Sequence, residues 1–160
     1  MEKIALGGGC HWCTEAVFSH LNGVTNVLQG WVSSKKAVEM SEAIIISYDP
    51  QQIPLDILIE IHLYTHSATA NHSMRGKYRS AIYTFSPEQE LEVEAILKEK
   101  QSLFEKKLIT EIYPFKEFRK NREEYLNYYK KNSAGLFCQR YIEPKLHLLR
   151  QKYKKHMHNL

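Results

Sequence analysis

Apolar residues follow two different spacings along this chain, and the spacings alternate from segment to segment. Short apolar runs predict buried strands, the clearest being "EAIIISY" with its three consecutive isoleucines, whereas apolar residues at every third or fourth position predict amphipathic helices. The predicted strands are 2–9, 24–32, 42–48, 78–85 and 108–114, and the predicted helices are 10–23, 54–66, 86–107, 122–132 and 144–158. This interleaving predicts an α+β fold, and residues 1–160 are long enough to form a single domain with its own core.

Local signals mark the ends of some predicted helices. Ser86, followed by Pro87 and then by Gln89, forms a capping box that starts the long third helix. Asn22 and Gly23 form a stop signal at the end of the first helix.

Charge and cysteine content exclude several classes of protein. The 22 basic and 18 acidic side chains leave a net charge of +4, concentrated in the tail "LRQKYKKHMH", which is typical of a solvated helix, so we expect no nucleic-acid partner. No signal peptide is visible, and no apolar run approaches the roughly 18 residues of a membrane span, so we expect no membrane partner. The three cysteines are an odd number at uneven spacing, unlike a secreted disulfide scaffold, so we expect a cytoplasmic protein. For the oligomeric state, a monomer is the default expectation.

The first chemical signal is the segment "ALGGGCHWCTEAVF", in which three glycines precede a cysteine at the start of a predicted helix. The unpaired N–H groups and the dipole at a helix N-terminus favour an anion, and they lower the pKa of a thiol placed there. Cys10 is therefore a candidate nucleophile. The alternative is a small buried cysteine that fills a tight turn.

Cys10 and Cys13 form a C-x-x-C pair, which opens two further interpretations. A structural zinc site needs four ligands, and Cys138 stands without a partner at ligand spacing, so we expect no metal. A thioredoxin-like dithiol is the more serious alternative, because that motif also follows a strand and opens a helix.

Four other residues carry possible chemistry. Glu42 borders the three isoleucines, and partial burial there would favour the protonated carboxyl that a general acid needs, although an ordinary solvated glutamate is the simpler interpretation. Tyr78 can donate a hydrogen bond from its hydroxyl or simply pack. Trp12 and Trp31 can line an apolar pocket or belong to the core.

Taken together, these segments resemble the A-type peptide methionine sulfoxide reductase family, from about residue 3 to about residue 150. The most specific segment is "GGGCHWCTEAVFSHLNGV", which resembles the family's Gly-Cys-Phe-Trp signature and the helix after it. The other similar segments, in chain order, are "EAIIISYDP", "YRSAIY", "EEYLNYYKKN" and "FCQRYIEPKLHLLRQKY". The resemblance implies a two-layer α/β sandwich with a ferredoxin-like core, a mixed sheet and flanking helices.

The resemblance also implies roles for individual residues. Cys10 matches the nucleophile that attacks the sulfoxide sulfur, Glu42 the acid that protonates the sulfoxide oxygen, and Tyr78 a hydroxyl that hydrogen-bonds this oxygen. Trp12 matches one wall of the pocket for the S-methyl group. The reaction leaves a sulfenic acid on the nucleophile, which a second thiol converts to a disulfide. An external reductant of the thioredoxin type then restores the thiols, and no prosthetic cofactor is expected.

Three departures from the family pattern fall in the substrate-binding part. His11 replaces the phenylalanine after the nucleophile, Trp31 replaces a tyrosine, and Ser73 replaces an acidic residue that helps to hold the substrate backbone. We therefore expect a reductase for the S-epimer of methionine sulfoxide, free or in peptides. The alternatives are a divergent member that acts on another small sulfoxide, a thiol–disulfide exchange or redox-sensing protein, and a scaffold used for binding.

The identity of the resolving thiol stays open at this stage. Cys13 is adjacent to the nucleophile, whereas Cys138 lies in the glycine-containing segment "SAGLFCQ", which can approach the site. The sequence interpretation slightly favours Cys138, because the catalytic loop and the C-terminal segment meet in this family.

Overall fold

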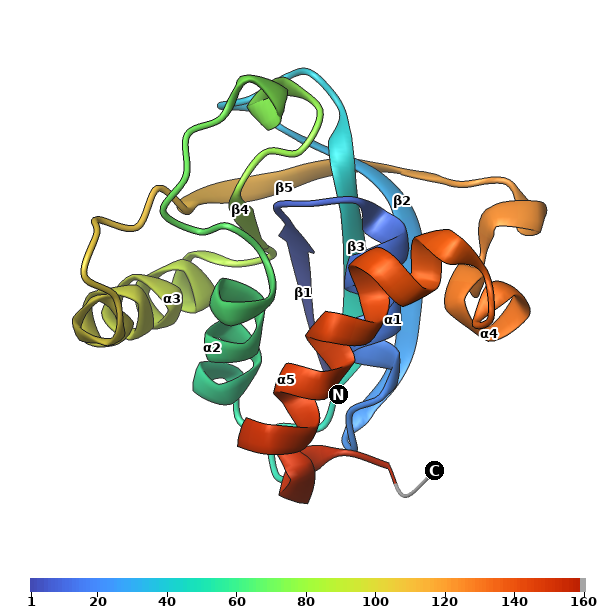
Figure 1. The fold of residues 1–160 in the computed structure, drawn as a ribbon. Coiled ribbons are helices and arrows are strands. Elements are labelled where there is room, and N and C mark those ends of the chain that lie inside the picture. The colour runs from blue at the N-terminus through green and yellow to red at the C-terminus, as the bar shows by residue number, and fades with distance from the viewer. Residues whose placement is uncertain (159–160) are drawn as a thin grey trace.

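The computed structural model describes residues 1–158 and contains a mixed sheet surrounded by helices (Figure 1). The strands are β1 (Glu2–Gly7), β2 (Val24–Ser34), β3 (Ser41–Tyr48), β4 (Ala81–Thr84) and β5 (Glu111–Lys120). The helices are α1 (His11–Ser19), α2 (Leu55–Thr65), α3 (Pro87–Lys100), α4 (Tyr128–Asn132) and α5 (Glu143–Lys152). Strands and helices interleave as predicted, which confirms the α+β class.

The strands close into a barrel in the order β1-β3-β2-β5-β4. β4 and β5 are parallel, and all the other pairs are antiparallel, so the sheet is mixed as expected. The prediction of a two-layer, ferredoxin-like sandwich is wrong, because β4 pairs with β1 while β5 pairs with both β4 and β2. β5 continues to Lys120 and β2 to Ser34, beyond their predicted ends. The residues added to β5 pair with 30–34 of β2, and this pairing closes the barrel.

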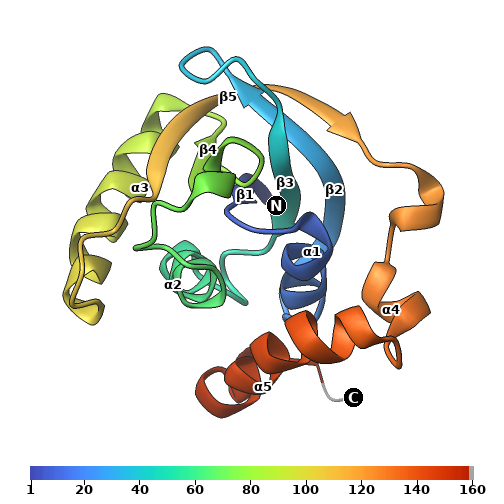
Figure 2. The same ribbon diagram turned by 45° about the horizontal axis from the view of Figure 1, so that its top comes forward.

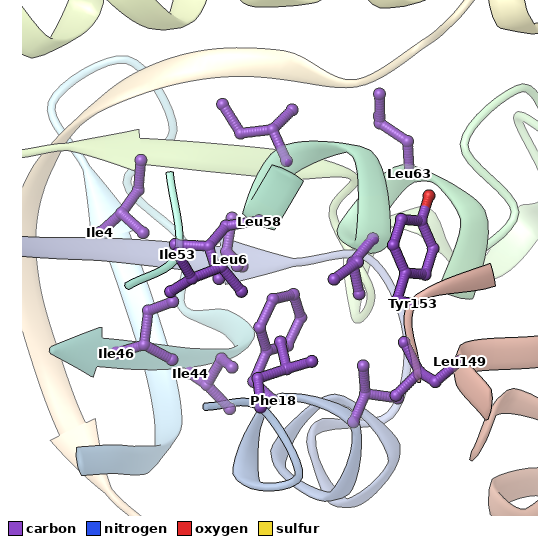
Figure 3. Close-up of a cluster of buried hydrophobic side chains, with 14 of the residues drawn as sticks. Ile4, Leu6, Phe18, Ile44, Ile46, Ile53, Leu58, Leu63, Leu149 and Tyr153 are labelled. Carbon is purple, nitrogen blue, oxygen red and sulfur yellow. The ribbon is translucent and has the colours of Figure 1, made fainter. Parts of the chain in front are cut away.

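Alternation along the strands divides the core into two parts. Ile4 and Leu6 on β1, with their partners Ile46 and Ile44 on β3, face the helices and pack with Phe18 of α1 (Figure 3). The intervening residues point the opposite way, into the barrel, and form a second cluster: Ala5, Val32, Ala43, Ile45, Ala81 and Tyr83. The three isoleucines thus serve both faces of β3, which explains why they follow one another without alternation.

The helices lie around the outside of the barrel (Figure 2). α3 begins as predicted: Ser86 accepts a hydrogen bond from the backbone N–H of Gln89 at 3.1 Å. The first helix is shorter than predicted and ends at Ser19, while Gly23 adopts φ +92 in the turn that follows. The predicted helix 122–132 is a 3-10 turn followed by the short α4, and among residues 1–158 no helix is long and apolar enough to cross a membrane.

Candidate active site

The glycine turn between β1 and α1 places Cys10 at the helix start. Cys10 is the N-cap residue of α1, with φ −59 and ψ 130. Gly8 has φ +156, and a Cβ atom there would lie 2.4 Å from Cδ2 of His66, so both the backbone angle and the neighbour require glycine. Arg75, in the loop between α2 and β4, links this loop to the glycine turn, because its Nη1 donates hydrogen bonds to the carbonyl oxygens of Gly8 and Tyr78, each at 2.8 Å.

The surroundings of Cys10 favour its thiolate. A hydrogen bond from the Cys13 thiol lowers the pKa of Cys10 most, and the backbone N–H groups of Trp12 and Cys13 add to this effect. Burial and the charge of Glu42 act in the opposite direction without cancelling it. The same hydrogen bond raises the pKa of Cys13, so Cys10 is the more acidic thiol of the pair and Cys13 the one that keeps its proton. The helix-start prediction is right in direction, although the largest effect comes from the second thiol.

A cavity of about 320 Å³ opens onto Cys10. It is lined by Gly8, Gly9, Cys10, His66, Ser67, His72, Met74, Tyr78 and Lys145. The structure therefore brings Tyr78 to the same cavity as Cys10, as the sequence predicted. Lys145 of α5 donates a hydrogen bond to the carbonyl oxygen of Thr65, and burial lowers its pKa while the charges of Cys13 and Cys10 raise it.

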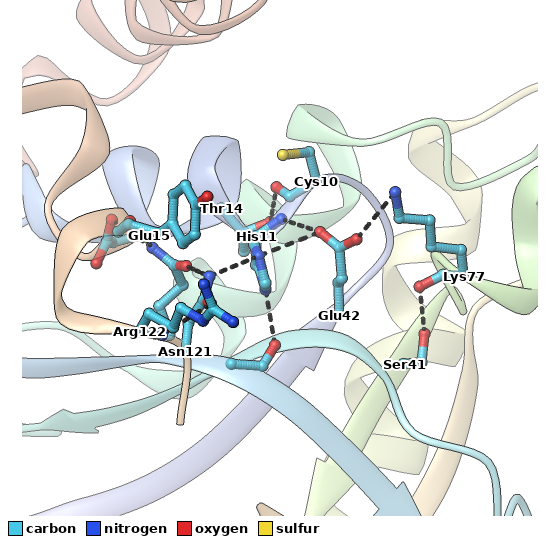
Figure 4. Close-up of polar contacts among 12 residues, drawn as sticks. Cys10, His11, Thr14, Glu15, Ser41, Glu42, Lys77, Asn121 and Arg122 are labelled. Atoms are coloured by element: carbon cyan, nitrogen blue, oxygen red, sulfur yellow. Dashed lines mark hydrogen bonds and ion pairs between the residues drawn. The ribbon is translucent and has the colours of Figure 1, made fainter. Parts of the chain in front are cut away.

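Glu42 lies at the start of β3 with only 5% of its surface exposed. Its Oε1 accepts the backbone N–H of His11 at 3.2 Å and lies 3.4 Å from Nε2 of the same residue (Figure 4). Its Oε2 lies 3.5 Å from Nζ of Lys77. The Tyr78 hydroxyl and the Glu42 carboxylate raise the pKa of Lys77, so this ammonium stays charged beside both groups. Glu42 is thus a buried carboxyl next to the Cys10 turn rather than a solvated strand end.

The tryptophans line a second cavity of about 590 Å³, which we call the tryptophan cavity. Its wall consists of His11, Trp12, Trp31, Arg119, Lys120, Asn121, Arg122 and Tyr125. Trp31 pairs with Glu42 across β2 and β3 and meets the His11 ring edge-on, with ring centroids 5.0 Å apart. The predicted substrate-binding residues His11, Trp12 and Trp31 therefore share a cavity, which is distinct from the cavity that Cys10 lines.

Segments near the C-terminus cover one side of Trp12. The Trp12 ring stacks on Tyr128 with centroids 3.9 Å apart and planes within 3° of parallel. Phe137 meets the same ring edge-on, at 5.4 Å. The next residue, Cys138, starts a π-helical turn and is fully buried, and all three cysteines are free thiols. The C-terminal segment thus meets the catalytic helix, as the sequence interpretation expected.

Ser73 lies apart from these groups. It opens a 3-10 turn (Ser73–Gly76) and is exposed, and its neighbours His72 and Met74 line the Cys10 cavity in its place.

Several residues around the site carried no clear signal in the sequence. Lys77 and Arg75 belong to a loop whose residues are mostly polar, and Lys145 looked like one of many lysines on a basic helix. Glu15 is buried, and its carboxylate accepts from the Gln29 side chain at 2.9 Å and from the backbone N–H of Asn127 at 3.0 Å. A charged residue inside the apolar pattern of α1 was the one available hint. Among residues 1–158 no group of three or more His, Cys, Asp or Glu side chains is placed to hold a metal ion.

Comparisons with known proteins agree with this arrangement. The family model described as peptide methionine sulfoxide reductase matches residues 2–157. The peptide methionine sulfoxide reductase MsrA of Acinetobacter baumannii (strain AYE) is 31% identical over 176 residues, which cover 99% of this chain and 100% of the relative. Mxr1 from Saccharomyces cerevisiae in reduced form superposes with a TM-score of 0.75 at 25% identity, over 86% of this chain and 88% of that one. Mxr1 in complex with Trx2 superposes with a TM-score of 0.63 at 26% identity, over 79% and 84% of the two chains. The chain therefore belongs to the peptide methionine sulfoxide reductase family.

Proposed function

We propose that this protein reduces the S-epimer of methionine sulfoxide, free or in peptides, to methionine. The observation that carries the proposal is the position of Cys10, a thiol with a lowered pKa at a helix start, in one cavity with Tyr78 and next to the buried carboxyl of Glu42. A sulfoxide needs both groups, because its oxygen leaves only after protonation. Family membership supports this activity over a thiol–disulfide exchange or redox-sensing role. We further propose that residues 1–160 act as one such domain.

In the first step the Cys10 thiolate attacks the sulfoxide sulfur. Glu42 gives its proton to the sulfoxide oxygen, and the Tyr78 hydroxyl donates a hydrogen bond to the same oxygen. The attack forms a bond between Sγ of Cys10 and the sulfoxide sulfur. As this bond and the S–O bond break, the hydroxyl group passes to Sγ of Cys10, methionine leaves, and Cys10 carries a sulfenic acid. The nearby Lys77 ammonium favours the return of Glu42 to its ionised form.

In the second step a thiol displaces this hydroxyl as water and forms a disulfide. The sequence slightly favoured Cys138, but the hydrogen bond between the Cys13 and Cys10 side chains supports Cys13 as the first resolving thiol. Lys145 lines the same cavity, and its positive charge favours the thiolate that Cys13 needs for the attack. Cys138, which is buried near the same helix, is then a candidate to attack the Cys10–Cys13 disulfide in a second thiol–disulfide exchange.

The substrate-binding residues and the reductant are proposed from the family resemblance and the comparisons. Trp12, Trp31 and His11 line the second cavity rather than the Cys10 cavity, so their part in binding the methyl group stays a prediction from the resemblance. Ser73 is exposed and uncharged, so it would hold the substrate backbone weakly. A thioredoxin-type protein is the proposed reductant, since a structural relative is solved in complex with Trx2. A cytoplasmic location, a monomeric state and the absence of a prosthetic cofactor stay predictions from the sequence.

Turnover with dithiothreitol tests the proposal. A peptide carrying the S-epimer of methionine sulfoxide should be reduced, and the R-epimer should not. Cys10→Ser should abolish the reaction, and Glu42→Gln should slow it by about 100-fold or more, the usual contribution of a general acid. His147→Gln, at an exposed position of α5, is the control and should match wild type. Lack of S-epimer reduction by wild type contradicts the proposal.

A further inference from the structure

His11 lines the tryptophan cavity and also contacts Glu42. Its side chain is almost fully buried, with 4% of the residue exposed, and it is absent from the lining of the Cys10 cavity. Its Nε2 lies 3.4 Å from Oε1 of Glu42 (Figure 4). The family signature has phenylalanine at this position, so the ring nitrogens are a feature of this chain.

The neighbours of His11 settle which ring nitrogen carries the fixed proton. Nδ1 lies 2.8 Å from the carbonyl oxygen of Gly30, which can only accept, so Nδ1 is the donor. Nε2 lies 3.2 Å from Nδ2 of Asn121. The orientation of that amide is fixed, because its Nδ2 donates to Oε1 of Gln29 at 2.7 Å and its Oδ1 accepts the backbone N–H of Arg122 at 2.9 Å.

Nε2 therefore has two partners of opposite kind. As a bare nitrogen it accepts from Asn121, and as a protonated nitrogen it donates to Glu42. The 3.4 Å separation from Glu42 is slightly long for a direct hydrogen bond, as catalytic hydrogen bonds often are without substrate. The site is thus arranged for a proton that moves on and off Nε2.

The proposed reaction needs such a proton. When the Cys10 thiolate, the Cys13 thiol and a sulfoxide become a disulfide, methionine and water, one proton is consumed beyond the one that the Cys13 thiol supplies. Glu42 gives it to the sulfoxide oxygen and is left as a carboxylate. A buried carboxylate next to bound substrate then has to be protonated again in each cycle.

We propose that His11 is a positioning residue that reprotonates Glu42 from the tryptophan cavity. The proton on Nε2 passes to Oε1 of Glu42, the neutral ring accepts from Asn121, and the ring then takes a proton from solvent in the tryptophan cavity. This inference rests on the proposed function, since it assigns a partner to the acid of that reaction. It makes the acid a His11–Glu42 pair that shares one mobile proton.

Other charges around the pair affect how firmly it holds this proton. Lys77, 3.5 Å from Oε2 of Glu42, favours loss of the proton, and a thiolate on Cys10 favours its retention. Arg119, Lys120 and Arg122 line the tryptophan cavity and also favour the neutral ring. Two of these three cations are paired: Lys120 with Glu123 at 2.9 Å and Arg122 with Glu124 at 3.5 Å, which reduces their effect. Glu15 is further away and reaches His11 only through Gln29 and Asn121.

The first test is the pH profile of steady-state methionine formation with saturating dithiothreitol, in which Glu42 has to be protonated again in every cycle. His11→Gln keeps an N–H donor for Glu42 but cannot carry the mobile proton, so Glu42 has to take each proton directly from water. We expect the rate of this variant to be within about threefold of wild type at pH 5.5 and at least tenfold lower at pH 8. His147→Gln is the control and should follow wild type throughout. A profile identical to wild type, or a loss by the same factor at every pH, overturns the proposal, because a packing role would not change the shape.

The second test needs no activity, so it separates the failure of this inference from the failure of the proposed function. Nitrogen-15 NMR of the histidine rings in wild type should show a proton on Nδ1 of His11 at all pH values and a pH-dependent change at Nε2. In Glu42→Gln, where the carboxylate partner is lost, the change at Nε2 should move to lower pH by at least one unit. An unchanged profile in this variant, or a bare Nδ1 in wild type, overturns the proposal even if no sulfoxide is reduced.

Discussion

Replacing Cys13 should make Cys10 less acidic, because the Cys13 thiol provides the largest stabilisation of the Cys10 thiolate. The remaining support comes from the backbone N–H groups of Trp12 and Cys13, which a side-chain substitution leaves in place. Cys13→Ala removes the donor, whereas Cys13→Ser keeps a hydroxyl donor at the same position. The alanine variant should therefore show a large effect and the serine variant a smaller one.

The size of the effect follows from one hydrogen bond to a charged group, which contributes about 1.5–3 kcal/mol. Since 1.4 kcal/mol corresponds to a factor of ten, the thiolate population of Cys10 should fall by about 10- to 100-fold at a pH below its titration. The alkylation rate should fall less, because a more basic thiolate is also a better nucleophile, with a Brønsted coefficient of about 0.4–0.5. The midpoint of the pH profile is therefore a better measure than the rate at one pH.

The assay is alkylation by iodoacetamide from pH 5 to 9, with the product on Cys10 quantified by tandem mass spectrometry. The midpoint should move to higher pH in Cys13→Ala and by a smaller step in Cys13→Ser. Cys138→Ala is the matched control, because this buried thiol has no direct hydrogen bond to Cys10, and its midpoint should stay at the wild-type value. An unchanged midpoint in Cys13→Ala would show that the helix start alone sets the acidity and would refute the reasoning.

Three further predictions concern the framework of the site. Gly8→Ala should lower the free energy of unfolding by about 2 kcal/mol or more in urea titrations, because of the φ of +156 at Gly8 and the His66 ring next to it. Gly9→Ala, whose Cβ would meet nothing within 4 Å, should not lower it, and equal losses in the two variants would contradict the prediction. Glu15→Ala should lower the free energy of unfolding by about 2–4 kcal/mol and speed proteolysis within residues 122–142, because the backbone N–H groups of Asn127 and Tyr128 lose their acceptor. Glu94→Ala, at an exposed position, should change neither. Burial lowers the pKa of His62 to about 4, below the roughly 6.5 of an unfolded chain, so the unfolded state binds more protons between these values and acid destabilises the fold. Between pH 6.5 and 5 the contribution of His62 to this loss is about 2 kcal/mol, so His62→Gln should lose about that much less free energy of unfolding than wild type, while His66, whose pKa burial also lowers, contributes in both proteins.

Local patterns in the sequence were enough for the interleaved elements and the start of α3, whereas the proximity of Tyr78 to Cys10 was expected only from the family resemblance. The barrel was not predictable in the same way. The second half of β5 reads "FKEFRK", in which charged residues outnumber apolar ones, and its pairing with β2 depends on residues more than 80 positions away in sequence. Short-range spacing carries no information on such a contact.

The role of His11 shows the same limit at the level of the site. The sequence identified the residue only as a departure from the family pattern in the substrate-binding part. Its actual surroundings depend on a carbonyl group of β2, a carboxylate of β3 and an amide after β5, which only the closed barrel brings together. The Cys13 contact, in contrast, follows from two residues three positions apart and was within reach of sequence reasoning.

The central claim is that Cys10 takes the oxygen of a methionine sulfoxide and passes the oxidation to a second thiol. The most direct measurement is a single turnover without reductant, in which reduced protein is mixed with excess S-epimer peptide, and both methionine and free thiols are counted. The account predicts that the first methionine formed per chain is accompanied by the loss of two thiols, and that a Cys10–Cys13 disulfide is the first product mapped by mass spectrometry. A first disulfide between Cys10 and Cys138 would restore the sequence-based preference for the resolving thiol. No methionine, or methionine formed with Cys10 still reduced and unmodified, would contradict the central claim.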